Sequence, residues 1–372
     1  PMSDKKILPN YWDYLGLYKL LNLQNGLETV EQDLNTDELH FIITHQSLEL
    51  WFKLMLAELR MARDHLAAPH LQEDQVPQVV HHLRRVSEIL RLAARTFGVM
   101  ETLTPQDFMN FRDKLTPASG FQSFQMREIE LVLGMDWTTR VQYGKTDPLD
   151  HIRKLADQSL TGEMAVKHIE AVLKETTLRQ ALHSWLYRTP IQGSIPSDGN
   201  DNAQVIDFID RYFAAIERYH EDQCQSLIQS SVAPPDNLIK RFAAHSEQAK
   251  VYLYATDVDQ EQQRFVQRYR AALLFIESYR TLPLLAWPRL LIDTIVEVEQ
   301  LMVMFRHRHA RSVERIIGRR VGTGGSSGVS YLDKTTEMRI FTELSAVRTL
   351  LLPTRYLPDL KEGDFYAFNQ PV

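Results

Sequence analysis

The chain has 372 residues, of which 44% are hydrophobic and 24% are charged, as is usual for a globular protein with a core of its own. Its formal net charge is −6 and its lysines and arginines are dispersed, which argues against a nucleic-acid-binding surface. The single cysteine, Cys224, excludes an internal disulfide bond and fits a reducing compartment.

A membrane-spanning segment is not expected, because no run of 18 apolar residues exists. The most apolar stretch, residues 281–295, is interrupted by Pro283, Pro288, Arg289 and Asp293. The first residues lack the apolar core of a secretory signal peptide. These features predict a cytoplasmic protein with neither a membrane nor a nucleic acid as partner.

Apolar residues recur with the helical period of 3.6, and no segment alternates as a strand would. The pattern predicts an all-α fold. We expect helices over residues 10–23, 36–67, 73–98, 105–115, 121–133, 163–187, 203–230, 235–254, 258–280, 286–318 and 335–351. The chain 1–372 is predicted to form a single helical domain, and the more charged segment of about 230–282 is predicted to be an inserted helical hairpin.

The first predicted helix carries an aromatic side made of Tyr11, Tyr14, Leu15 and Tyr18. Such a side can join the core of its own chain. Because it belongs to a terminal helix, it can also dock on another subunit. The sequence alone leaves both interpretations open.

The predicted helix 36–67 is apolar on most sides near its start, which is typical of a buried helix. Phe41, His45, Leu48 and Phe52 recur at helical spacing and therefore share one face. His45 is either a core histidine with a hydrogen-bond partner or a polar group placed over a buried pocket.

Arg112 follows two phenylalanines, Phe108 and Phe111, and shares a helical side with them and Leu115. A guanidinium among aromatic rings is costly to bury unless it meets an anion. That anion is either a carboxylate of the protein or the carboxylate of a substrate, held through a two-pronged contact.

The predicted helix 286–318 carries a long apolar stripe in which His309 is the only ionisable residue. Arg306, His307, Arg308 and Arg311 are predicted to lie mostly off this stripe. His307 and His309 point about 200° apart around the helix, so they cannot share one metal ion. A lone histidine on an apolar face suits axial ligation of a haem. The alternative is a core histidine with a hydrogen-bond partner.

The segment from Gly322 to Gly328 reads GTGGSSG and resembles a phosphate-binding loop only superficially. No strand precedes it and no Lys-Ser or Lys-Thr pair follows it. A dinucleotide-binding pattern would also need glycine at Ser327. The loop is either a linker that ends a helix or a flexible cover for a small polar ligand.

Five segments carry these features in order: YWDYLGLYKLLNLQ, ELHFIITHQSLELWFK, LTPQDFMNFRDKLTPASGFQS, WLYRTP and FRHRHARSVERIIGRRVGTGGSSGVSYL. Together they resemble the tryptophan 2,3-dioxygenase family. The resemblance covers most of the chain and is weakest over about 230–282. It implies an all-α, haem-binding helical bundle with an additional helical hairpin.

The resemblance also implies a haem b cofactor whose iron is ferrous in the active state. His309 matches the proximal iron ligand of the family, and it stands fourteen residues before Thr323, a spacing that excludes His307. Ser119 and Gly120 match positions that line the edge of the haem.

Substrate-binding positions follow from the same motifs. His45 matches the distal histidine, the catalytic-site residue that hydrogen-bonds the indole nitrogen. Arg112 would hold the substrate carboxylate, and Thr323 would meet the ammonium and carboxylate groups as the loop closes. Phe41 and Phe108 would pack on the indole ring.

The family forms homotetramers built as dimers of dimers, which makes a second copy of the chain an expected partner. The N-terminal segment would complete the site of a neighbouring subunit through Tyr11, Tyr14 and Leu15.

The reaction implied is cleavage of the indole C2–C3 bond of L-tryptophan by O2 to give N-formylkynurenine, the first step of the kynurenine pathway. One alternative is a haem-dependent monooxygenase that acts on tryptophan or a modified indole in a biosynthetic pathway. Another is a haem or tryptophan sensor without turnover. The complete set of His45, Arg112 and Thr323 favours the dioxygenase, because a sensor does not need every positioning group.

Overall fold

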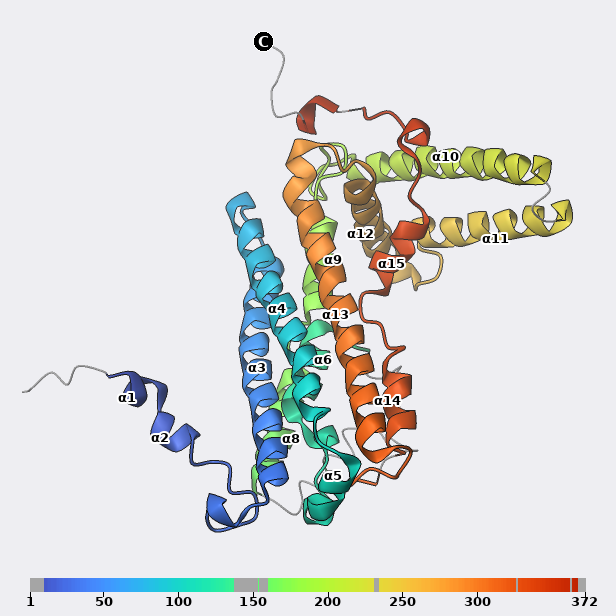
Figure 1. Cartoon of the computed structure of the whole chain (residues 1–372). Coiled ribbons are helices and arrows are strands. Elements are labelled where there is room, and N and C mark those ends of the chain that lie inside the picture. Colours follow the sequence, from blue (N-terminus) through green and yellow to red (C-terminus); the bar gives the residue numbers. More distant parts are fainter. Residues whose placement is uncertain are drawn as a thin grey trace, which may run out of the picture.

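The computed structural model describes residues 10–136, 153, 160–230, 234–325, 327–361 and 363–366 (Figure 1). Helices account for its regular structure, and the described residues form no β-strand beyond an isolated bridge between Ile191 and Ser194. The predicted all-α class is confirmed. None of the described helices combines the length and apolarity needed to cross a membrane.

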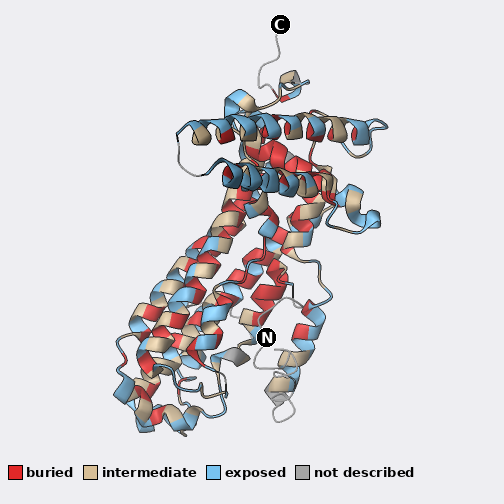
Figure 2. Ribbon diagram, turned by 90° about the vertical axis from the view of Figure 1, so that its right-hand side faces the viewer, coloured by how far each residue is buried: buried red, intermediate tan, exposed pale blue. Residues whose placement is uncertain are grey.

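Three long helices form the body of the molecule: α3 (Thr36–Ala67), α4 (Val76–Met100) and α13 (Ala286–Ile317). They run side by side in Figure 1, and α4 packs extensively against both of the others. In α4, fully buried residues such as Val79, Leu83 and Leu90 recur at helical spacing, so one face joins the core. Figure 2 shows buried residues along the inner sides of the long helices.

Helix α3 begins at the predicted residue because Asn35 caps it. The Asn35 side chain accepts a hydrogen bond from the backbone N–H of Asp37 at 2.8 Å. Asp37 and Glu38 place negative charge in the first turn, where it interacts favourably with the helix dipole. Its bounds, 36–67, agree with the prediction.

Two predicted helices are each divided in the structure. Residues 10–23 form α1 (Tyr11–Leu15) and α2 (Leu17–Leu20), because Gly16 between them adopts a left-handed conformation with φ of +62°. The predicted helix 163–187 is α8 (Leu160–Val172) and α9 (Leu178–Arg188). Thr177 starts α9 with a capping box to Gln180, a signal that is present in the sequence.

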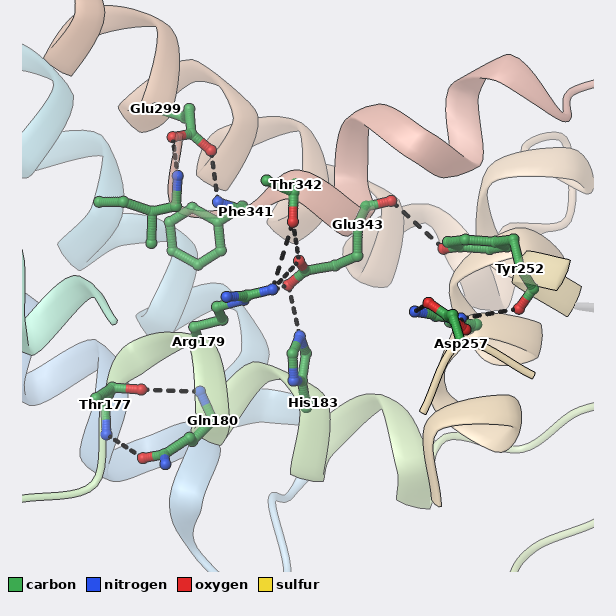
Figure 3. Close-up of polar contacts among 12 residues, drawn as sticks. Thr177, Arg179, Gln180, His183, Tyr252, Asp257, Glu299, Phe341, Thr342 and Glu343 are labelled. Atoms are coloured by element: carbon green, nitrogen blue, oxygen red, sulfur yellow. Dashed lines mark hydrogen bonds and ion pairs between the residues drawn. The ribbon is translucent and has the colours of Figure 1, made fainter. Parts of the chain in front are cut away.

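The prediction of one helix over 335–351 is wrong. The structure has α14 (Val329–Thr335) and α15 (Thr342–Thr349), with irregular backbone between them. The backbone N–H groups of Ile340 and Phe341 donate to the Glu299 carboxylate of α13 at 2.6 and 2.7 Å, and Figure 3 shows the Phe341 contact. This tertiary partner replaces the intrahelical acceptors that a continuous helix would supply.

At one end of the body lie α5 (Pro105–Phe111) and the short 3-10 turns η3 (Arg112–Leu115) and η4 (Gly120–Gln122). Helix α6 (Phe124–Leu133) follows them and packs along α3. Ser123 caps α6 by accepting a hydrogen bond from the backbone N–H of Met126 at 3.2 Å. This arrangement brings the segments around Arg112 and Ser119 to the ends of α3 and α13 (Figure 1).

At the opposite end, α10 (Asp201–Gln229) and α11 (Pro235–Tyr254) extend sideways as a hairpin (Figure 1). Helix α12 (Gln260–Ser278) packs against α9, and its residues 271–276 are fully buried. The division of the chain into one domain with an inserted segment stays a prediction.

Candidate active site

A cavity of about 260 Å³ lies where α3, α4, α5, α6, α13 and the glycine-rich loop, residues 322–328, meet. Its walls are mostly apolar, with aromatic side chains from four helices: Phe41, Phe52, Phe97, Phe108 and Phe305. A concave, largely apolar pocket with few polar groups is typical of a ligand or cofactor site.

His309 enters this cavity from α13. Its ring stacks on Phe97 with centroids 5.2 Å apart, and Phe305 lies 6.3 Å away. Neither ring nitrogen hydrogen-bonds to the described part of the chain. Burial lowers the pKa of the imidazole to about 4, so it is neutral at physiological pH, the form that binds a metal ion. The alternative interpretation of His309, a core histidine with a hydrogen-bond partner, therefore does not hold among the described residues.

His45 reaches the same cavity from α3, one turn after Phe41. Its Nδ1 lies 2.8 Å from the Phe41 carbonyl oxygen, which can only accept a hydrogen bond. Nδ1 therefore carries the proton. Burial lowers the pKa of His45, so the ring is neutral and Nε2 holds a free lone pair. The histidine thus has both a protein hydrogen bond and an acceptor atom for a ligand.

Arg112, the first residue of η3, lines the cavity beside Phe108. One terminal nitrogen, Nη2, donates to the Val321 carbonyl oxygen at 2.6 Å. Its Nε is buried without a hydrogen-bond partner in the described residues, and no carboxylate among them pairs with the guanidinium. A buried donor without an acceptor is costly, so this position favours an anionic ligand.

The glycine-rich loop packs on the segment that follows η3. Thr323 Oγ1 donates to the Ala118 carbonyl oxygen at 2.6 Å. A Cβ atom added to Gly324 would lie only 2.7 Å from the Ser119 Cβ, so this close approach requires glycine. Thr323, Ser119 and Gly120 all line the cavity, while Ser326 lies outside the described residues.

The structure adds two charged residues of α6, Arg127 and Glu130, to the cavity and brings Arg306 of α13 against them. Arg127 Nη1 donates to Glu130 Oε2 at 2.8 Å within α6, and Arg306 Nη2 donates to Glu130 Oε1 at 3.4 Å. All three are buried and line the cavity, so Arg306 does not lie off the buried face as predicted. The spacing of Arg127 and Glu130 on one helical face was a signal that could have indicated them.

The N-terminal aromatic residues do not reach the cavity of their own chain. The side chains of Tyr11, Tyr14 and Leu15 on α1 are 71%, 82% and 46% exposed. In Figure 1, α1 stands apart from the helical body. They therefore do not join the core of this chain, which leaves the second predicted role, docking on another subunit, for test.

Comparison with known proteins gives consistent results along the chain. The sequence model described as tryptophan 2,3-dioxygenase matches residues 5–351. A tryptophan 2,3-dioxygenase of Sorangium cellulosum is 43% identical over 370 residues, which cover 97% of this chain and 87% of the relative.

A protein of Ralstonia nicotianae, named tryptophan 2,3-dioxygenase 2, is 42% identical over 371 residues, which cover 97% of this chain and 98% of the relative. A shorter tryptophan 2,3-dioxygenase-like protein of Xanthomonas campestris is 42% identical over 272 residues, or 72% of this chain and 98% of its own. With near-complete coverage at this identity, the chain belongs to the tryptophan 2,3-dioxygenase family.

Proposed function

We propose that this chain is a haem-dependent dioxygenase that inserts both atoms of O2 across the indole C2–C3 bond of L-tryptophan and yields N-formylkynurenine. The observation that carries the proposal is the arrangement of three groups in one apolar cavity. These are a histidine without a protein hydrogen bond, a histidine with a free acceptor nitrogen, and an arginine with an unpartnered buried donor.

The chemistry of the cavity lining suits a haem b group, with His309 as the iron ligand. Neutral His309 offers a ring nitrogen that no described protein group uses, and Phe97 and Phe305 surround it with apolar surface. Ser119 and Gly120 would lie at the edge of the macrocycle. The haem, when bound in its ferrous state, supplies the activation of O2.

The chain itself positions the substrate. Arg112 would bind the carboxylate through the Nε–H that is now unpartnered, and Thr323 would meet the ammonium and carboxylate groups. Phe41 and Phe108, whose ring centroids are 5.9 Å apart, would pack on the indole ring. Two polar anchors and two aromatic contacts fix one orientation of the bicyclic ring, which favours reaction at one bond.

His45 would accept a hydrogen bond from the indole N–H. The Phe41 carbonyl holds its Nδ1 proton, so only Nε2 is available to the substrate. A neutral imidazole is too weak a base to remove the indole proton outright. The role of His45 is therefore to orient the ring, and the Thr323 loop excludes water from the closed site.

The exposed face of α1 supports a second subunit as partner. Tyr11, Tyr14 and Leu15 would cover the cavity of a neighbouring chain in a homotetramer built as a dimer of dimers. Such an arrangement would bury apolar side chains that a single chain leaves in water.

Mass spectrometry of the product tests the reaction. Reduced, haem-loaded protein is supplied with L-tryptophan and isotopically labelled dioxygen. Two labelled oxygen atoms in a ring-opened product are expected. One labelled atom would indicate the monooxygenase instead, and a normal haem spectrum without any product would contradict both reactions.

A further inference from the structure

A second cleft of about 210 Å³ lies far from the candidate active site, where the α10–α11 hairpin meets α15. We call it the hairpin cleft and define it by Ile216, His220, Ala249, Tyr252, Ala346 and Leu350. In Figure 1 these helices lie at the end of the molecule opposite α5 and α14. The cleft is therefore separate from the cavity that contains His309.

The floor of the hairpin cleft is apolar and buried. Ile216 and Ala249 are 1% and 0% exposed, and Leu350 closes the same floor from the end of α15. Tyr219 stands at one side, held edge-to-face against Tyr356 with ring centroids 5.1 Å apart. Aromatic and aliphatic walls of this kind suit the binding of a planar aromatic ring.

The described residues that line the cleft include no carboxylate, lysine or arginine. Its titratable groups are His220, His245, Tyr219 and Tyr252. Burial and the neighbouring His245 lower the pKa of His220, and burial raises the pKa of Tyr252, so both are neutral near pH 7. An ion would find no opposite charge to offset its loss of hydration.

The imidazole ring of His220 is held in place, and one of its nitrogens is available to a ligand. His220 Nδ1 hydrogen-bonds to Ser246 Oγ at 2.7 Å, which orients the ring. Its Nε2 has no hydrogen-bond partner in the described chain. The Ser246 hydroxyl can donate or accept, so either tautomer of His220 is available and Nε2 can serve a ligand N–H or O–H group.

A metal ion does not fit this pair of histidines. The rings of His220 and His245 have centroids 6.3 Å apart, but the described residues contain no group of three or more His, Cys, Asp or Glu side chains able to hold a metal. Metal sites in proteins commonly need at least three such ligands.

The back wall of the cleft is anchored in the helical body. The Tyr252 hydroxyl donates to the Glu343 carbonyl oxygen at 3.4 Å, and the Glu343 carboxylate binds Arg179 and His183 of α9 (Figure 3). Tyr252 thus has a fixed place between the hairpin and the body. A wall held in this way is formed before any ligand arrives, which lowers the entropic cost of binding.

We propose that the hairpin cleft is a binding site for a small, uncharged aromatic molecule of one or two fused rings with one N–H or O–H group. An apolar cavity of about 150 Å³ holds benzene, so the volume here suits a slightly larger ring system. The rings would lie over Ile216 and Ala249, and the polar group would meet His220.

Fluorine NMR of 5-fluoroindole tests the proposal, with haem-loaded protein whose active site is first filled by saturating L-tryptophan in the absence of O2. Ala346→Phe places a ring inside the cleft, whereas Ser345→Phe places the same ring on an exposed position of the same helix outside it. A bound resonance is expected in wild type and in Ser345→Phe, and it should be absent from Ala346→Phe. A resonance that persists in Ala346→Phe, or one that both variants lose, would overturn the assignment.

Two further measurements keep the test decisive if Ala346→Phe does not fold. His220→Phe keeps a ring but removes the hydrogen bond, and affinity for 5-fluoroindole should fall about tenfold. The anionic probe 5-fluoroindole-2-carboxylate should bind at least about tenfold more weakly than 5-fluoroindole, because no cation lines the cleft. Unchanged affinity in His220→Phe, or equal binding of the anion, would contradict the proposed ligand class. Neither result depends on the dioxygenase reaction.

Discussion

At the scale of single residues, the two cavity histidines differ in which ring atoms the protein uses. The Nδ1–H group of His45 donates a hydrogen bond to the Phe41 carbonyl oxygen, so only Nε2 is left for a ligand. His309 makes no hydrogen bond with the described residues and is in contact with Phe97. The first arrangement suits an oriented hydrogen-bond acceptor and the second suits a metal ligand.

Replacing His309 with alanine should abolish stoichiometric haem binding, because the cavity would lose its proposed iron ligand. The haem-to-protein ratio and the absorption spectrum of purified protein measure this. His307→Ala, two positions earlier on the exposed side of α13, should retain the normal ratio. Retention of normally ligated haem by His309→Ala would contradict the ligand assignment.

Replacing Arg112 with alanine should weaken L-tryptophan binding by roughly 10- to 100-fold, the usual effect of losing a hydrogen bond to a charged group. The haem-to-protein ratio should stay unchanged. Spectral titration of the haem-loaded variant measures the dissociation constant. Arg112→Lys retains the charge without the two-pronged geometry, so its dissociation constant should lie between those of wild type and Arg112→Ala. Equal loss of haem and substrate would instead indicate a structural role.

At the scale of elements, the glycine-rich loop depends on a contact that only glycine permits. Gly324 lies against Ser119, and Thr323 donates to the Ala118 carbonyl oxygen one residue earlier. The loop after α13 is thereby joined to the turn after η3, so two distant parts of the sequence form one edge of the cavity.

Gly324→Ala should displace this loop, because the added Cβ would lie 2.7 Å from the Ser119 Cβ. Relief of such a clash costs about 1–3 kcal/mol, so the KM for L-tryptophan should rise about tenfold. Limited proteolysis should also cleave the loop faster. Ser119→Gly in the same chain removes the obstructing atoms and should restore part of the affinity; a double variant no better than Gly324→Ala would refute the contact.

At the scale of the whole molecule, Glu343 joins the hairpin end to the helical body. Burial alone would raise the pKa of this carboxyl group, but the hydrogen bond and charge of His183, together with Arg179, hold it at about 2. Figure 3 shows the three side chains meeting between α9 and α15. Because folding lowers the pKa from 4.5, the ionised carboxylate stabilises the folded state above pH 4.5, and this contribution is lost as pH falls through about 2.

Glu343→Gln should therefore lower the free energy of unfolding by about 3 kcal/mol at pH 6. The difference from wild type should shrink as pH falls from 5 towards 2. Urea unfolding at several pH values measures both effects. Glu88→Gln, a change at a side chain that is 74% exposed, serves as the control and should alter stability little at any pH. A Glu343→Gln difference that does not vary with pH would contradict the ion pair.

Assembly is tested by mixing two variants whose activity is impaired at subsaturating L-tryptophan. One chain carries Arg112→Ala, and the other carries Tyr11→Ser with Tyr14→Ser on α1. If α1 completes the site of a neighbour, mixed oligomers contain some sites with an intact Arg112 and an intact α1, and activity should return. Absence of recovery in verified mixed oligomers would show that α1 contributes to the site of its own chain or to no site.

The sequence was sufficient for the fold class and for the bounds of α3, since period and capping are local properties. It also placed Phe41, His45 and Phe52 on one face, because residue spacing defines the faces of a helix. The division between α8 and α9 was also encoded locally in the Thr177 capping box and could have been predicted.

What the sequence alone determined is therefore the set of helices, their apolar faces and the motifs that they carry. Only the tertiary structure decided which polar atoms have partners: that Nε of Arg112 lacks one, that His45 donates from Nδ1, and that Arg306 is buried against Glu130. It also decided that residues 335–351 do not form one helix, because the Glu299 carboxylate of α13 accepts hydrogen bonds from the backbone N–H groups of Ile340 and Phe341. The physical reason is that helix propensity and spacing act within a few residues, whereas hydrogen bonding and burial depend on segments that folding brings together.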